Sequence, residues 1–268
     1  MAIKIAAASV IGLEHRQTGI LRQDRFMTSS RVMKYGFLEI PFNGDYDAYV
    51  AEWDYGDGYA ILAVADGLSS ARLSHIAASI AVKVAINSVN PSNEGTLIDA
   101  IKAVIRAIKN EANRNRLSIK DFETTLAIGL MRNNECFGIG IGDSYVVAIN
   151  GESPKLISSI MKGENPNETI PITSSLLNVD ELSINKSDCT ALVVMSDGIM
   201  GSLQAKYDQS TNSWIFEPYQ KFYIPLMRKL NDMNLEEYGL WLLNYLRRLE
   251  DLYSFMTDDK TLAIAVQT

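Results

Sequence analysis

The stretch VADGLSSARLSHIAASIAV, residues 64–82, decides the fold because it joins a buried strand to a helix through two unusual residues. An apolar run over 60–65 ends on Asp66 and Gly67, and a pattern of helical period begins almost at once. An aspartate at this place either caps a turn or presents a carboxylate to a metal ion at the edge of a sheet. The rest of the chain has to distinguish these alternatives.

The composition is that of an ordinary globular protein. The chain has 268 residues, of which 47% are hydrophobic and 21% charged, so a disordered or fibrous class is excluded. A net charge of −7 argues against binding to nucleic acid. No apolar run reaches the roughly eighteen residues of a membrane span, and the apolar N-terminus favours a strand over a signal peptide.

The two cysteines, Cys136 and Cys189, both lie in apolar, strand-like runs. We interpret them as buried free thiols, which agrees with a location in the reducing cytoplasm. A zinc site is not expected, because the two histidines, His15 and His75, show no paired ligand spacing.

Short strand-like runs, rich in apolar residues and bounded by turn formers, dominate the chain. They cover residues 3–11, 34–40, 48–53, 60–65, 124–131, 136–141, 145–150, 191–195 and 261–266. Asn133-Asn134, Gly142-Asp143 and Asn150-Gly151 predict tight turns, the last of type I′. Apolar residues at helical spacing predict helices over 70–89, 96–116, 218–230 and 235–255.

This order of elements predicts an α+β fold. The strands and helices do not alternate as in βαβ units, and the hairpin turns imply antiparallel sheets, so we expect a layered sandwich with helices on the outside. Ser70 is a candidate cap for the first helix, and Glu250 is expected on the solvated face of the last. A polar, weakly periodic segment at about 154–188 predicts a surface excursion from a single domain that spans 1–268.

Several of the strands begin or end on an aspartate; the candidates are Asp24, Asp66, Asp143, Asp197 and Asp258. A single such residue is most often a turn residue or a helix cap. If the strand ends converge, however, the carboxylates repel one another unless a cation lies among them. Oxygen ligands alone select hard cations such as Mg²⁺ or Mn²⁺.

Six short motifs follow one another along the chain: QD (23–24), VADG (64–67), TTLAIGL (124–130), GIGDS (140–144), VVMSDGI (193–199) and DDKTLAIAV (258–266). In this order they resemble the metal-dependent serine/threonine protein phosphatases of type 2C, most of all a divergent bacterial branch. The resemblance covers Gly12 to Val266. It implies a four-layer α/β/β/α sandwich of two antiparallel sheets packed face to face, with a two-metal site at one end.

The resemblance also implies a ligand set for two Mn²⁺ or Mg²⁺ ions. Asp66 would bridge the two ions, and the carbonyl of Gly67 would bind the second, since a glycine lets the backbone approach closely. Asp197 and Asp258 would complete the shell of the first ion. The choice of Asp258 over Asp259 depends on register alone.

Two further acids have implied roles. Asp24 would orient a metal-bound water, and Asp143, together with Asp197, would help to hold a third ion. A water or hydroxide that bridges the metals would attack the phosphorus of phosphoserine or phosphothreonine in a protein, without a covalent intermediate. The natural counterpart would be a serine/threonine kinase; nucleic acid and membrane are not expected partners.

The sequence departs from the family pattern at Gln23, Leu68, Gly201 and Gly19, where relatives carry a metal-binding Glu, a proposed general acid His, a further Asp and a phosphate-binding Arg. The candidate substitutes for phosphate binding, each weighed against a structural role, are Arg16, Arg22 and His15. The departures leave two alternatives open: a catalytically impaired regulatory or binding module, and a hydrolase of a small phosphorylated molecule.

Overall fold

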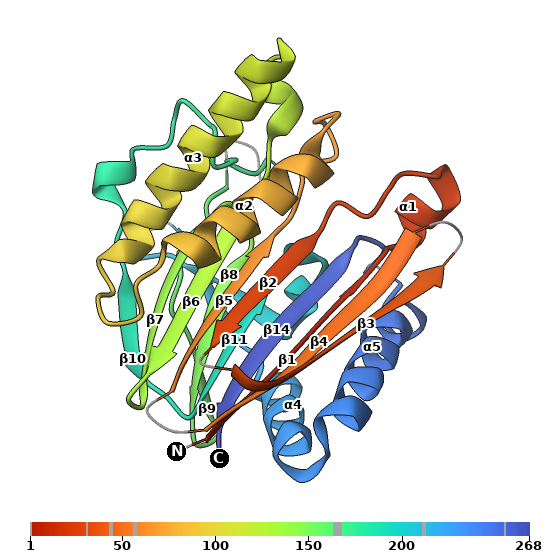
Figure 1. Ribbon diagram of the computed structural model, residues 1–268, viewed down its shortest axis with the longest axis vertical. Helices are drawn as coiled ribbons and strands as arrows, with labels where there is room; N and C mark the ends of the chain where they lie inside the picture. The colour runs from red at the N-terminus through yellow and green to blue at the C-terminus, as the bar shows by residue number, and fades with distance from the viewer. Residues whose placement is uncertain are drawn as a thin grey trace.

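The computed structural model describes residues 2–30, 32–42, 45–55, 58–162, 168–210, 213–254 and 256–268. Two β-sheets pack face to face, and helices cover their outer faces (Figure 1). This arrangement confirms the α+β sandwich with two antiparallel sheets.

The larger sheet has seven antiparallel strands in the order β3-β4-β1-β14-β11-β8-β9. Its strands are β1 (Ala2–Val10), β3 (Val32–Phe42), β4 (Asp45–Tyr55), β8 (Tyr145–Asn150), β9 (Ser153–Leu156), β11 (Ala191–Met195) and β14 (Lys260–Gln267). The central strands β1, β11 and β14 are buried along almost their whole length, which explains their continuous apolar runs.

The second sheet has five antiparallel strands in the order β10-β7-β6-β5-β2. They are β2 (Arg25–Ser30), β5 (Tyr59–Ala65), β6 (Leu126–Arg132), β7 (Glu135–Ile141) and β10 (Asn185–Asp188). A separate hairpin pairs β12 (Leu203–Asp208) with β13 (Ser213–Pro218). Ile5, Leu62 and Leu192 belong to the apolar layer that seals the two large sheets together.

The helices divide between the two outer faces (Figure 1). The α-helices are α1 (Leu13–Thr18), α2 (Ser74–Ser88), α3 (Thr96–Asn115), α4 (Gln220–Asp232) and α5 (Leu235–Leu252), and the 3₁₀ helices are η1 (Ile119–Phe122), η2 (Val179–Glu181) and η3 (Asp197–Ser202). Helices α2 and α3 share an apolar core with the five-stranded sheet, and α4 and α5 share one with the seven-stranded sheet. No helix in the described ranges is long and apolar enough to cross a membrane.

Helix α2 begins later than the sequence predicts. Its first residue is Ser74, and the segment before it forms turns held by Ala71 N donating to Leu68 O (2.9 Å) and Leu73 N donating to Asp121 O (2.8 Å). Ser70 is therefore not the cap of this helix. The contact with Asp121, far along the chain, is the reason that local pattern alone misplaced the start.

The interpretation of the cysteines as free thiols is wrong. Cys136 in β7 and Cys189 just before β11 form a disulfide, which links the two sheets across 53 residues of sequence. Disulfides are rare in a reducing cytoplasm, so the argument from cysteine usage no longer supports that location, which stays a prediction.

The ends of the predicted excursion at 154–188 are ordered strands. Strand β9 pairs with β8 and strand β10 pairs with β7, so both add edges to the sheets; residues 163–167 lie outside the described part of the chain. The turn between β8 and β9 is displaced by one residue from the predicted type I′ position. Asn150 already pairs with Ser153, and the positive φ of 60° falls on Gly151.

Candidate metal centre and active site

The aspartates next to the strand ends lie together at one end of the sandwich. Asp66 follows β5, Asp197 lies two residues after β11, and Asp258 lies two residues before β14. Because β14 is antiparallel to β1 and pairs Lys260 with Val10, its start lies beside the end of β1. Both chain termini lie at the opposite end of the sheets from α1 (Figure 1).

The backbone of Asp66 is held by the two threonines that precede β6. Thr125 N donates to Asp66 O (2.8 Å), Asp66 N donates to Thr125 Oγ1 (3.0 Å), and Thr124 Oγ1 donates to Asp66 O (2.8 Å). Thr125 Oγ1 also bonds Ser144 Oγ (2.7 Å) next to Asp143. The threonines of the TTLAIGL motif thus fix the direction in which Asp66 leaves the sheet.

Three carboxylates meet at this end. Asp66, Asp143 and Asp197 each offer an oxygen within 4.8 Å of the other two, and they line a cleft of about 800 Å³ together with Asp258. The structure therefore brings together four of the five acids that the sequence singles out.

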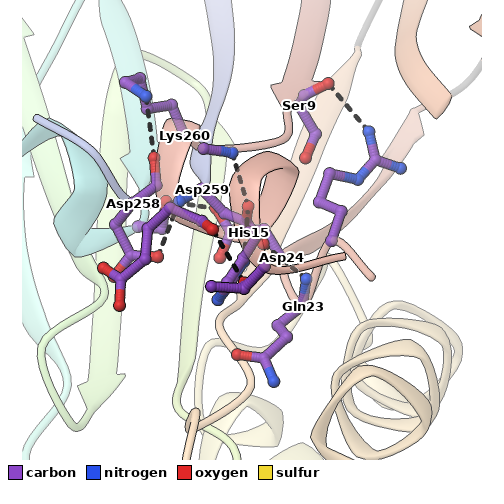
Figure 2. Close-up of polar contacts among 12 residues, drawn as sticks. Ser9, His15, Gln23, Asp24, Asp258, Asp259 and Lys260 are labelled. Carbon is purple, nitrogen blue, oxygen red and sulfur yellow. Dashed lines mark hydrogen bonds and ion pairs between the residues drawn. The ribbon is translucent and has the colours of Figure 1, made fainter. Parts of the chain in front are cut away.

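The neighbouring side chains of Asp258 and Asp259 have different surroundings (Figure 2). Asp259 is 2% exposed; its Oδ1 accepts from Gly12 N (2.8 Å) and lies 3.0 Å from His15 Nδ1, while its Oδ2 accepts from Gln23 N. Asp258 lines the cleft. Because both oxygens of Asp259 are engaged, Asp258 is the better candidate ligand.

A buried ion-pair network supports the same turn. Lys260 Nζ donates to Asp258 O (2.8 Å) and to Glu250 Oε1 (2.8 Å), and the second oxygen of Glu250 binds Arg16. The expectation that Glu250 is solvated is wrong, since its side chain is only 9% exposed. Its burial could have been inferred from its spacing, because Glu250 lies four residues after the buried Leu246 in α5 and therefore on the same face of that helix.

The fifth acid, Asp24, lies behind the cleft. It is 0% exposed, and Ser196 Oγ donates to its Oδ2 (2.6 Å). Ser196 also accepts from Thr261 N (3.0 Å), so Asp24 is tied to β11 and β14 at once. Its neighbour Gln23, not Asp24, lines the cleft.

The cluster is electrostatically costly without a cation. Burial, and then the neighbouring carboxylates, raise the pKa of Asp66 well above its ordinary value, raise the pKa of Asp197 to about 8 and raise that of Asp24 to about 7. Desolvation by the cleft walls also raises the pKa of Asp258. Asp259 behaves in the opposite way: despite burial, its hydrogen bond and ion pair with His15 lower its pKa.

These residues fit a hard divalent cation. Asp197 Oδ1 and Asp24 Oδ1 are buried oxygens without a hydrogen-bond partner among the described residues, and such orphaned acceptors are rare in native proteins. The donors on offer are all oxygens, which Mg²⁺ and Mn²⁺ prefer. A cation would neutralise the carboxylates that now raise one another's pKa.

The three candidate phosphate-binding residues differ in position. Arg16 pairs with Glu250, and Arg22 is 7% exposed and donates from Nη1 to Ser9 O (2.9 Å). His15 lines the cleft beside Asp258, and its pairing with Asp259 raises its pKa. The structure thus gives both arginines a structural contact and gives His15 access to the cleft.

The glycines after two of the acids are needed for packing. A Cβ on Gly67 would lie 2.7 Å from the backbone of Ser74, and a Cβ on Gly198 would lie 1.8 Å from Asp259 O. The absence of a side chain at Gly67 therefore allows the backbone to contact the first turn of α2, besides any approach to a cation. Gly198 lets the loop after β11 contact the turn before β14.

A two-sheet sandwich with an acidic cleft at one end is the arrangement expected of a type 2C phosphatase. The chain belongs to the protein phosphatase 2C family, whose family model matches residues 45–246. It is a serine/threonine protein phosphatase by class. No curated protein sequence matches the chain significantly.

Solved bacterial phosphatases share the fold. The serine/threonine phosphatase PstP/Ppp of Mycobacterium tuberculosis superposes with a TM-score of 0.60 at 15% identity and covers 99% of each chain. Stp1 of Staphylococcus aureus gives 0.53 at 15% identity, over 91% of this chain and 94% of its own. The catalytic domain of PstP in complex with two manganese ions gives 0.52 at 14% identity, over 91% and 97%.

Proposed function

We propose that the protein hydrolyses phosphoserine and phosphothreonine in proteins with the help of two divalent cations, Mn²⁺ or Mg²⁺. The observation that carries this proposal is that Asp66 and Asp197 meet in the cleft and that Asp197 Oδ1 is buried there, with no hydrogen-bond partner in the part of the chain that the structure describes. The catalytic domain of PstP, which has the same fold, was solved with two manganese ions.

The proposed ligands all line the cleft. Asp66, Asp197 and Asp258 would hold the cations through their carboxylates. Gly67, which follows Asp66 and lines the same cleft, would contribute its carbonyl oxygen. Bound there, the cations supply Lewis acidity, which lowers the pKa of a water and neutralises the phosphoryl oxygens.

The chain's own residues position the reactants. Ser196 fixes Asp24 behind the cleft, so the carboxylate of Asp24 orients a water from the side away from solvent. His15, held by Asp259, donates a hydrogen bond to a phosphoryl oxygen. Leu68 also lines the cleft and can neither donate nor accept a proton, so the proton for the leaving alcohol has to come from water.

The exposed apolar and polar residues of the cleft walls favour a phosphoprotein as the substrate. Its walls include Ser69, Ile170 and the 78% exposed Leu176, which together offer polar and apolar contacts to an extended segment of chain. The enzyme would oppose a serine/threonine kinase.

The test is release of phosphate from p-nitrophenyl phosphate and from a phosphothreonine peptide. We expect turnover with Mn²⁺, none with EDTA, and loss of at least two orders of magnitude in kcat for Asp197→Ala. Asp180→Ala, which removes an exposed partner of Lys102, is the matched control and should keep full activity. Cation binding without turnover on either substrate would instead indicate the impaired, phosphatase-like module.

A further inference from the structure

The carboxylate of Asp143 already pairs with a positively charged side chain, that of Lys162. Lys162 Nζ forms an ion pair with Asp143 Oδ2, and Thr169 Oγ1 donates a hydrogen bond to the same oxygen. The Asp143 side chain is 3% exposed, whereas that of Lys162 is 31% exposed. The ammonium therefore reaches the buried acid from the solvent side.

These contacts join the excursion to the acidic cluster. Asp143 lies in the turn after β7, and Met161 N donates to Gly142 O in the same turn (2.6 Å). Lys162 and Thr169 are bridged to each other in antiparallel fashion. Farther along, Ile172 N donates to Thr124 O (2.9 Å), so both arms of the excursion are fastened beside Asp66.

The pairing changes what Asp143 can bind. It has one oxygen within 4.8 Å of oxygens of Asp66 and Asp197, close enough to share a divalent cation with them. Lys162 and Thr169 engage Oδ2 of this carboxylate, and a divalent cation bound to either of its oxygens would be repelled by the ammonium beside it. Charge balance at Asp143 is therefore satisfied from within the chain.

A comparison within the molecule shows that this is not an ordinary surface pair. Lys186 and Glu135 also form an ion pair, but their side chains are 53% and 35% exposed, and pairs of that kind contribute little. In the Lys162 pair one partner is buried and belongs to the cluster that lines the cleft.

We infer that Lys162 is a built-in cation of the acidic cluster: its ammonium holds Asp143 and withholds that carboxylate from divalent cations. Lys162 is a positioning residue in this role. This inference rests on the proposed function. It adds that the native enzyme would bind only two cations, which Asp66, Asp197 and Asp258 would hold.

The test counts bound Mn²⁺ per chain, by calorimetry and by electron paramagnetic resonance of the free ion. The native protein should bind two ions. Lys162→Met should bind a third, and Lys162→Arg, which keeps the charge, should return the count to two. Lys162→Met combined with Asp143→Ala should also bind two, because the freed carboxylate is gone. The matched control Lys186→Met should behave as the native protein.

A second readout does not depend on counting. Without metal, Lys162→Met removes the ion-pair partner of a buried carboxylate, so its Tm should fall below that of the native protein, and saturating Mn²⁺ should raise its Tm by more than it raises the native Tm. Lys162→Gln, which still offers Asp143 a hydrogen bond, replaces Lys162→Met if the latter does not fold.

The outcomes separate the two proposals. Three ions in the native protein, or two in both the native protein and Lys162→Met, would overturn the inference and leave the phosphatase proposal intact. The expected counts without hydrolysis of any substrate would overturn the phosphatase proposal alone. Absence of Mn²⁺ binding to the native protein would overturn both.

Discussion

The metal-free protein should lose stability as the pH rises from 6 to 8. Asp24 is fully buried, and burial together with Asp259 raises its pKa to about 7 from the ordinary 3.8. A carboxyl whose pKa is higher in the folded state binds its proton more tightly there than in the unfolded chain. Its contribution to stability is therefore greatest at low pH and is lost as the pH rises through the folded pKa.

The size of the effect follows from that value. Between pH 6 and pH 8, Asp24 passes from mostly protonated to mostly ionised in the folded protein, while the unfolded chain is ionised throughout. The free energy of unfolding then falls by roughly 1 kcal/mol from this group alone. Asp197, with a pKa of about 8, and His15, whose pKa is raised by Asp259, act in the same direction.

Urea unfolding at pH 6, 7 and 8 in EDTA measures this dependence. With saturating Mn²⁺ the sign should reverse, because cations and protons compete for the same carboxylates and the cation wins at higher pH. Asp24→Asn is the control: it should remove roughly 1 kcal/mol of the fall and leave the remainder. A metal-free protein whose stability is flat or rises between pH 6 and 8 would refute the electrostatic account of the cluster.

Three more perturbations test the supports of the fold and of the site. Replacing Cys136 and Cys189 by serine opens a 53-residue loop, and chain entropy predicts a loss of about 4 kcal/mol in denaturant unfolding; an unchanged midpoint would contradict the disulfide. Gly198→Ala places a Cβ against the turn before β14, so calorimetry should show Mn²⁺ affinity reduced roughly 10–100-fold, whereas unaltered affinity would mean that the turn yields freely. Glu250→Gln leaves a fully buried ammonium without its carboxylate and should cost roughly 3–5 kcal/mol of stability; a cost under ~1 kcal/mol would show the network to be dispensable.

The strands and the acids could be predicted because each carries a local signal. Apolar runs with turn formers at their ends located β5, β8 and β11, and an aspartate directly after a buried run marked Asp66 and Asp197. The hairpin at Asn133 and Asn134, where φ is 49° and 63°, has the residues that left-handed turns favour. Convergence of the strand ends needed the order of all the motifs, since no single motif fixes which strands are neighbours.

The partners of those acids could not be predicted, because they come from distant parts of the chain. Lys162 contacts Asp143 from the excursion, where the sequence has no periodicity, and Lys260 contacts Glu250 through the packing of α5 on the seven-stranded sheet. The disulfide could not be predicted for the same reason. Cys136 and Cys189 each look like an ordinary strand residue, and only the pairing of the sheets brings their sulfurs together.

The lysines near the cleft leave some of the aspartates at the strand ends without a positive partner among the described residues. The ammonium of Lys162 pairs with Asp143. The ammonium of Lys260 donates to the backbone carbonyl of Asp258 and to Glu250, and not to the carboxylates in the cleft. Within the described ranges, Asp197 Oδ1 and Asp24 Oδ1 stay buried without a hydrogen-bond partner. Each such carboxylate must either hold a proton or meet a cation from solution. A bound cation would keep the acids ionised at neutral pH, so the free energy that the fold loses by burying these carboxylates would be recovered on divalent cation binding.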